Sequence, residues 1–166
     1  MKLEALLTHA LQKGARGAKL IKVDQVVVMD WVYWKCRFGC PHYGKILTCP
    51  PYSPNSQQTR ALLKGYEHAL LLKYPSQDYH RLLLELEREA FLRGFYSAWS
   101  LTAGRCRLCE SCNLEIGRCL HPEQARPSME ACGIDVFATA RNAGFDIKVL
   151  TSKNEKYQRI CLLLVR

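Results

Sequence analysis

Nine cysteines in a chain of 166 residues are the feature that most restricts what this sequence can fold into. Seven of them fall in two short segments, residues 36–49 and 106–119. Small secreted proteins use many cysteines for disulfides, but they have even numbers of cysteines and little hydrophobic core. This chain is long enough to bury a core of its own, and its cysteine count is odd. We therefore expect reduced thiols that bind a metal.

The second segment has the more specific spacing. Two residues separate each of the first three cysteines, and the fourth follows seven residues later, so that the set is Cys106, Cys109, Cys112 and Cys119. The C-x2-C-x2-C spacing is the first part of the bacterial ferredoxin pattern, whose thiolates bind iron–sulfur clusters. It predicts a four-iron, four-sulfide cluster on these four cysteines. A structural zinc ion also binds four thiolates and is the alternative.

The first segment has three cysteines, Cys36, Cys40 and Cys49. Its C-x3-C start is found in radical-SAM enzymes, but the next cysteine of that pattern would stand where this chain has Tyr43. The chain is also too short for the barrel of those enzymes. Proline follows both Cys40 and Cys49, which stiffens the backbone and helps to exclude water. We predict a second iron–sulfur cluster here, with a zinc ion or structural thiols as the alternatives.

The fourth ligand of this first site stays open at the level of sequence. Cys132 is one candidate. His42 and Tyr43 lie inside the segment, and either of them is expected to bind an iron or to form a hydrogen bond with a sulfide. Without a fourth protein ligand, one iron would be free to bind water or substrate and would act as a Lewis acid. Cys161 lies in an apolar stretch, where we expect a small buried hydrophobic residue.

Other side chains near the cysteines have two interpretations each. His121 is either a hydrogen-bond donor to a cluster sulfide or a turn residue. Arg126 either neutralises cluster charge or forms a surface salt bridge. The large aromatic residues Trp31, Trp34 and Phe38 are expected to form a hydrophobic lid over the first segment.

Hydrophobic periodicity predicts an α+β fold made of one domain, residues 1–166. We expect a mixed sheet with helices packed on it and the two cysteine-rich loops, residues 36–56 and 104–127, at one end. The expected helices cover residues 3–11, 56–66, 78–94, with an exposed charged face that includes Glu87, and 128–141. The expected strands cover residues 19–34, 68–74, 95–102, 147–150 and 159–165.

The charge pattern argues against nucleic-acid binding. The formal net charge is +9, yet there is no run of five or six lysines and arginines. A docking face for an acidic redox partner uses the same diffuse charge equally well. No apolar run reaches the ~18–20 residues of a membrane helix, and residues 1–7 do not resemble a signal peptide. We expect a cytoplasmic protein without a membrane span.

Two blocks of the sequence resemble a known family. They run from Lys35 to Pro54, which includes Cys-Arg-Phe-Gly-Cys-Pro-His-Tyr-Gly-Lys, and from Cys119 to Phe137, which includes Cys-Leu-His-Pro-Glu-Gln-Ala-Arg-Pro-Ser. The family comprises small cysteine-rich prokaryotic proteins described as predicted metal-binding proteins of unknown function. The resemblance implies that the seven clustered cysteines form the metal sites. It also implies a cytoplasmic protein, often from anaerobic metabolism, and leaves the reaction open.

Three functions follow from these observations. The first is a one-electron redox module with two four-iron clusters and a partner protein. The second is an enzyme with an open iron at the three-cysteine site, for desulfurisation or dehydration chemistry. The third is a zinc-stabilised binding protein. The ligand count at the first segment distinguishes the first two, because an open iron needs a missing fourth ligand and a pocket.

Overall fold

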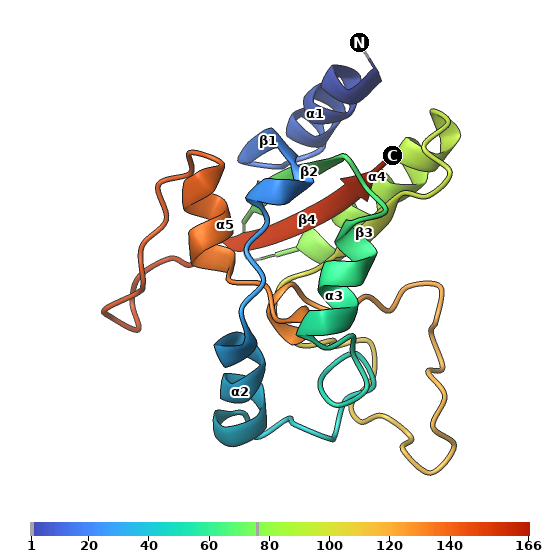
Figure 1. Ribbon diagram of the computed structural model, residues 1–166, viewed down its shortest axis with the longest axis vertical. Helices are drawn as coiled ribbons and strands as arrows, with labels where there is room; N and C mark the ends of the chain where they lie inside the picture. Colours follow the sequence, from blue (N-terminus) through green and yellow to red (C-terminus); the bar gives the residue numbers. More distant parts are fainter. Residues whose placement is uncertain (1, 76) are drawn as a thin grey trace.

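The computed structural model describes residues 2–75 and 77–166 (Figure 1). Within these residues, five α-helices and a four-stranded sheet confirm the predicted α+β class. In chain order the elements are α1 (Lys2–Gln12), β1 (Gly17–Lys22), the 3-10 turn η1 (Val23–Gln25), α2 (Asp30–Gly39), α3 (Ser56–Leu63), β2 (His68–Tyr74), α4 (Tyr79–Leu92), β3 (Trp99–Leu101), η2 (Glu130–Cys132), α5 (Val136–Asn142) and β4 (Arg159–Val165).

The sheet has the order β1-β2-β4-β3, and every pair of neighbouring strands is antiparallel. The predicted mixed sheet is therefore wrong. Strands β2 and β3 run in the same direction and are joined through α4, which is the arrangement that produces a parallel pair. The C-terminal strand β4 is inserted between them and pairs with both, so that two antiparallel pairs replace the expected parallel one.

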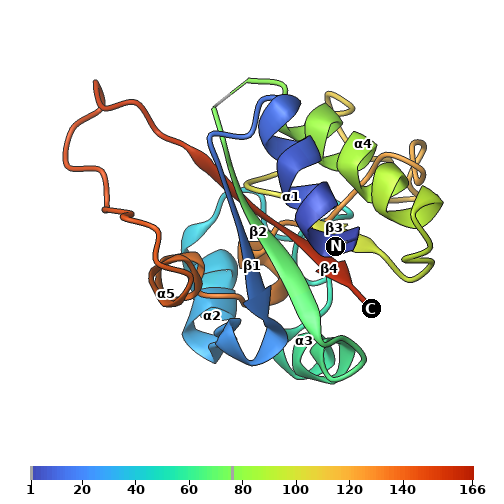
Figure 2. The same cartoon turned by 90° about the horizontal axis from the view of Figure 1, so that it is seen from above.

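Helices cover both faces of the sheet. Helices α1 and α4 lie on one side, and α2, α3 and α5 lie on the other (Figure 2). Alternate residues of a strand point to opposite faces. In β2, Leu70 and Leu72 therefore pack in the core with α1 and α4, and Ala69 and Leu71 pack in the opposite core with η2 and α5. Burial on both faces explains why β2 and β4 are apolar along almost their whole length.

Several predicted elements are confirmed. Strands β2 and β4 have the predicted bounds, and α1, α3 and α4 begin and end within three residues of the expected positions. Helix α3 starts at Ser56, but its N-cap is Asn55, whose side chain accepts a hydrogen bond from the backbone N–H of Gln58. No helix in the described residues has the length and apolar character that crossing a membrane requires.

The stretch predicted as a strand over residues 19–34 is wrong after Lys22. Strand β1 ends at Lys22, and residues 30–39 form helix α2. The sequence Trp31-Val32-Tyr33-Trp34 favours a strand because β-branched and aromatic residues are common there. Tertiary contacts override this preference. The preceding segment is fixed to the segment after η2, since the backbone N–H of Met29 donates to the carbonyl of Gly133 at 2.8 Å.

Two other predicted elements differ. Residues 147–150 form no strand, and the expected helix over residues 128–141 is two shorter helices, η2 and α5. The break falls at Gly133, whose φ of +76° is the left-handed conformation that glycine adopts most easily. Strand β3 is also shorter than predicted, and only residues 99–101 of the expected 95–102 belong to it.

Replacing Gly133 with alanine is expected to destabilise the fold strongly. A Cβ atom there would lie 2.5 Å from Oγ of Ser56, at the start of α3, and would also require a left-handed backbone. The backbone strain alone costs about 1–2 kcal/mol, and the steric clash adds to it. The measurement is the free energy of unfolding in urea.

Gly144 supplies the matched control for this change. It has the same φ of +76°, but nothing lies within 4 Å of where its Cβ would be. Gly144→Ala should therefore show only the backbone cost, and the difference between the two variants reports the contact with Ser56. Equal losses in both variants would mean that this close approach does not contribute.

Candidate metal centre

Both cysteine segments lie at the same end of the molecule, in the lower part of Figure 1 beyond the end of the sheet. All nine cysteines belong to the described residues, and all are free thiols. The seven in the two segments are half-buried, whereas Cys132 and Cys161 are buried. The clustered thiols are therefore available to a ligand and are also partly shielded from water.

Helix α2 positions the first two cysteines. Cys36 lies in the helix and Cys40 is its C-cap residue, so the predicted loop begins four residues later than expected. Side chains four residues apart lie on the same helix face, which directs both thiols to one side. The backbone N–H of Cys40 donates to the carbonyl of Cys36 at 3.3 Å. Burial raises the pKa of Cys36, and the charges of Cys40 and Glu130 raise it further.

Cys49 connects the two cysteine segments electrostatically. Burial is the main cause that raises the pKa of its thiol to about 11. The negative charges of Cys36 and Cys40 add to this effect, and the charge of Cys106 contributes more weakly. Cys49 thus lies within electrostatic range of both other thiols of its own segment and of one thiol of the other segment.

Buried hydrogen bonds fix the first segment to η2. The hydroxyl of Ser53 donates to the carbonyl of Ala131 at 2.7 Å, and the hydroxyl of Thr59 donates to the carbonyl of Cys132 at 2.7 Å. Buried polar groups of this kind need such partners. The 3-10 turn η2 is therefore held against the loop that follows Cys49 and against α3.

The second segment belongs to a long loop whose two ends are held together. Residues 103–127 contain no helix or strand, as predicted for the second cysteine loop. At the base of this loop, the backbone N–H of Thr102 donates to the carbonyl of Pro127, and the N–H of Met129 donates to the carbonyl of Thr102, each at 2.9 Å. The loop therefore starts and finishes at one point on the edge of the sheet.

Cys106 is affected by the other three thiols of this loop. Burial raises the pKa of Cys106, and the charges of Cys112, Cys119 and Cys109 raise it further, while a backbone hydrogen bond from Leu108 lowers it. The other three thiols of the set therefore lie within electrostatic range of Cys106.

Backbone N–H groups also point at the sulfur atoms of this loop. The N–H of His121 donates to Sγ of Cys119 at 3.4 Å, and Leu108 makes the equivalent bond two residues after Cys106. Such donors favour the charged form of a thiol. The carbonyl of His121 accepts hydrogen bonds from the N–H groups of Gln124 and Ala125, as its alternative role as a turn residue requires. The N–H groups directed at sulfur suit thiolates that bind a metal.

Arg126 differs from both of its predicted roles. It forms a buried salt bridge with Glu87 of α4, with Nη2 and Oε1 2.6 Å apart and side-chain exposures of only 10% and 14%. The guanidinium also lies 4.5 Å from the ring centroid of Trp99. The same carboxylate accepts a hydrogen bond from the backbone N–H of Ser100 at 2.8 Å. Glu87, expected on the exposed face of its helix, instead joins the end of the second loop to α4 and β3.

The predicted aromatic lid is wrong for two of its three residues, Trp34 and Phe38. Trp34 and Phe38 are 61% and 79% exposed, and they lie on the face of α2 opposite to Val32 and Cys36. Helical spacing causes this, because residues 34 and 38 share one face and residues 32 and 36 share another. Trp31 is 40% exposed, with Nζ of Lys35 4.9 Å from the centroid of its ring. Trp34 and Phe38 therefore do not cover the first segment.

The remaining candidate ligands have different environments. Cys132 lies in the hydrophobic core on the α5 side, and burial raises the pKa of its thiol to about 12, with a smaller contribution from the charge of Cys49. Cys161 lies in the opposite core, completely buried, as predicted for a small hydrophobic residue. His42 is half-buried in the first segment, and Tyr43 forms a side-chain hydrogen bond with Tyr33.

The thiols do not close around a single ion. Across residues 2–75 and 77–166, no three side chains of His, Cys, Asp or Glu converge closely enough to hold one metal ion. Each thiolate of a four-iron cluster binds a different iron, so a cluster takes thiolates that lie farther apart than the ligands of one ion.

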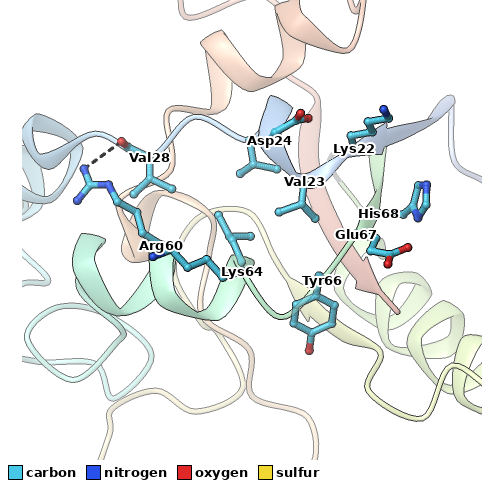
Figure 3. A pocket seen from close by; sticks show the side chains of 11 residues that line it. Lys22, Val23, Asp24, Val28, Arg60, Lys64, Tyr66, Glu67 and His68 are labelled. Carbon is cyan, nitrogen blue, oxygen red and sulfur yellow. Dashed lines mark hydrogen bonds between the residues drawn. The ribbon is translucent and has the colours of Figure 1, made fainter.

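A separate hollow of about 740 Å³ lies between η1, α3 and the start of β2 (Figure 3). None of the described residues that line it is a cysteine. Arg60, at its edge, donates to the carbonyl of Val28 and to Oδ1 of Asp30, both at 3.1 Å. This hollow is therefore distinct from the cysteine centre.

Sequence reasoning missed three charged residues that surround the centre, namely Glu87, Glu130 and Arg159. Glu130 precedes Cys132 by two residues, and its charge raises the pKa of Cys36. Arg159 begins β4, and its guanidinium lies beside Gly104 at the start of the second loop. The residues that lie beside these three side chains are distant in sequence, and no local sequence pattern predicts their positions.

The chain was also compared with protein families, with curated proteins and with solved structures. No curated protein and no solved structure shows significant similarity to the chain. The model of one family, described as predicted metal-binding protein (DUF2284), matches residues 19–165. The match includes all nine cysteines and every strand except the first two residues of β1. The chain therefore belongs to the DUF2284 family of predicted metal-binding proteins.

Proposed function

We propose that this metal-binding protein holds two four-iron, four-sulfide clusters and transfers single electrons. One cluster is assigned to Cys106, Cys109, Cys112 and Cys119. The other is assigned to Cys36, Cys40 and Cys49 in the first segment. The observation that carries this proposal is that both cysteine segments lie at the same end of the molecule (Figure 1), where two neighbouring clusters could exchange an electron.

The preference for iron and sulfide over zinc rests on the spacing of the second set. Zinc sites with four cysteines usually pair two C-x2-C units across a longer gap, whereas three cysteines at intervals of two residues are typical of four-iron clusters. The N–H groups of Leu108 and His121 directed at sulfur support this choice, because such donors tune the reduction potential of clusters.

The fourth ligand of the first set is assigned by proximity. Cys132 lies within electrostatic range of Cys49, and the hydrogen bond from Thr59 to its carbonyl holds η2 beside the first segment. His42 is the alternative ligand, since it is half-buried within the segment itself.

In this function the protein undergoes no net chemical change. One electron enters from a reduced partner protein, and the same electron leaves to an oxidised one. The net charge of +9 and the exposed basic side chains of α2, Lys35 and Arg37, suit an acidic partner. We further propose that residues 1–166 form one domain and that the protein works in the cytoplasm, where thiols stay reduced.

A second candidate function has its own observation. Cys36 and Cys40 line a cavity, as an enzyme with an open iron at this site would require. Such an iron would supply Lewis-acid chemistry to a bound substrate. Coordination by only three protein ligands favours this enzyme, and coordination by four favours the electron carrier.

Anaerobic purification followed by iron and sulfide analysis tests the proposal. We expect about eight irons and eight sulfides per chain, a brown colour with broad absorbance, and reversible reduction followed by electron paramagnetic resonance. Magnetic coupling between the two reduced clusters would show that they are neighbours. A colourless protein that retains two zinc ions would overturn the proposal in favour of a zinc-stabilised binding protein.

A further inference from the structure

A cavity of about 690 Å³ lies next to Cys36 and Cys40. It is formed by α2, η2, α5 and the segment that leads into β4. Its size is within the range of about 300–1,000 Å³ that small-molecule sites have. The cavity extends well beyond the two cysteines, to Phe137 and Val149. It therefore has room for a ligand in addition to any group that the thiols hold.

Two polar atoms of the residues around this cavity are buried without a partner. In the described residues, four buried side-chain nitrogen or oxygen atoms have no hydrogen-bond partner, and two of these are Oε2 of Glu130 and Nε of Arg159. Both residues line this cavity. Buried polar atoms without partners are rare in native proteins and call for an explanation, such as a missing ligand.

The guanidinium of Arg159 is held in a fixed position. It lies 5.3 Å from the ring centroid of Tyr79 and 4.6 Å from that of Tyr157. Its Nη1 atom would be 3.2 Å from a Cβ placed on Gly104, so the group also lies against the backbone of the second loop. A positioned guanidinium with an unused donor is well suited to bind a carboxylate.

The other lining residues define the rest of the ligand. Trp31, Ile134 and Phe137 provide an apolar wall. Lys35, Arg141 and Arg159 carry positive charge, and Asp135 and Glu130 carry negative charge. The three basic side chains outnumber the two acidic ones, so the cavity suits an anion. The unpartnered oxygen of Glu130 is an acceptor, and a ligand that satisfies it needs a hydrogen-bond donor.

We infer that this cavity binds a small carboxylic acid with an apolar side chain and a donor group on the carbon next to the carboxylate. Its carboxylate contacts Arg159, its amino or hydroxyl group donates to Glu130, and its side chain packs on Trp31 and Phe137. Both 2-amino and 2-hydroxy acids have this chemistry. The inference depends on the cavity alone and does not require a cluster on Cys36 and Cys40.

Four probes of similar size test the inference on the full-length chain, by calorimetry and by the change in tryptophan fluorescence. L-leucine and 2-hydroxy-4-methylpentanoate have all three features and should bind with saturation. 4-Methylpentanoate lacks the donor and L-leucinamide lacks the carboxylate, so each should bind about tenfold more weakly or worse. Saturable binding of either complete probe supports the site and identifies its preferred donor group.

Single substitutions then test the proposed contacts of Arg159 and Glu130 with the bound ligand. Arg159→Gln should weaken both complete probes about tenfold or more, because a charge-assisted bond to the carboxylate is lost. Glu130→Gln should weaken L-leucine more than the hydroxy acid, since it removes the charge that attracts the ammonium group. Lys64→Gln, in the separate hollow of Figure 3, is the matched control and should change nothing.

Three outcomes would overturn the inference. They are the absence of binding by all four probes, equal binding of all four, or an equal effect of Lys64→Gln and Arg159→Gln. The probe series on the unmodified chain decides the question even if a variant fails to fold. Iron content is measured on the same samples, so that loss of clusters and loss of ligand binding are scored independently.

Discussion

Replacing Cys109 with alanine is expected to remove about half of the iron and sulfide from the anaerobically purified protein. Cys109 is the second of the four thiols in the loop from 103 to 127, and the proposed cluster on that loop needs all four. The cluster on Cys36, Cys40 and Cys49 uses other ligands and should remain. The measurement is iron and sulfide per chain, together with the loss of the magnetic coupling between the reduced clusters.

The same variant should keep its sheet. The hydrogen bonds of Thr102 with Pro127 and Met129 close the base of the loop without help from any cysteine. Far-ultraviolet circular dichroism should therefore change little, because the loop contains no helix or strand. Within the loop, however, metal binding and local folding are coupled. Limited proteolysis should cut Cys109→Ala between residues 103 and 127 faster than it cuts the unmodified protein.

Cys161→Ala is the matched control for this experiment. It removes a thiol of the same size, but one that is completely buried on β4 in the core with α1 and α4. Its iron content should equal that of the unmodified protein, although its stability should fall modestly because of the small cavity. Full iron content in Cys109→Ala would contradict the assignment of the second set of ligands.

Much of the fold follows from local sequence patterns. The short, continuous apolar runs of β2 and β4 are typical of strands buried on both faces. Their predicted bounds are confirmed. Helix α2 was not predictable in this way. Its four residues Trp31 to Trp34 have strand preferences, and the contacts that favour a helix come from residues about one hundred positions later, such as Gly133.

The order of the strands depends equally on distant contacts. A strand–helix–strand succession from β2 through α4 to β3 usually indicates a parallel pair. Strand β4, at the far end of the chain, inserts between β2 and β3. No local pattern in residues 68–101 predicts this insertion.

The cysteine centre, like the fold, could be predicted from the sequence only in part. The spacing of the second set predicts that its four thiols lie near one another, and the charges of the other three raise the pKa of Cys106, as nearby thiols would. The role of Glu87 was not predictable, because its partner Arg126 is 39 residues away and a glutamate on an amphipathic helix is normally exposed. Glu130 and Arg159 are similarly brought together at one cavity only by the tertiary fold.

Arg126→Ala is expected to lower the free energy of unfolding by about 3–5 kcal/mol, the range observed when one partner of a buried ion pair is removed. The change leaves the carboxylate of Glu87 buried without its guanidinium partner, although Ser100 still donates to it. It also removes the hydrogen bond from Arg126 to the carbonyl of Ala125, at the end of the second cysteine loop. Urea unfolding at neutral pH measures the effect.

A surface salt bridge on the same helix provides the control. Arg81 and Glu85 also have a nitrogen–oxygen distance of 2.6 Å, but their side chains are 62% and 46% exposed. Solvent screens an exposed pair of this kind, so Arg81→Ala should cost no more than about 0.5 kcal/mol. Since the two pairs have equal distances, the contrast isolates the effect of burial.

Adding Glu87→Gln to Arg126→Ala separates charge from packing. If the buried carboxylate causes the loss, the double variant should be more stable than Arg126→Ala alone, because an amide is less costly to bury than a charge. If the lost packing of the guanidinium on Trp99 is the cause instead, the second substitution will bring no recovery. Recovery accompanied by normal iron content would show that this ion pair stabilises the base of the loop and is not required for metal binding.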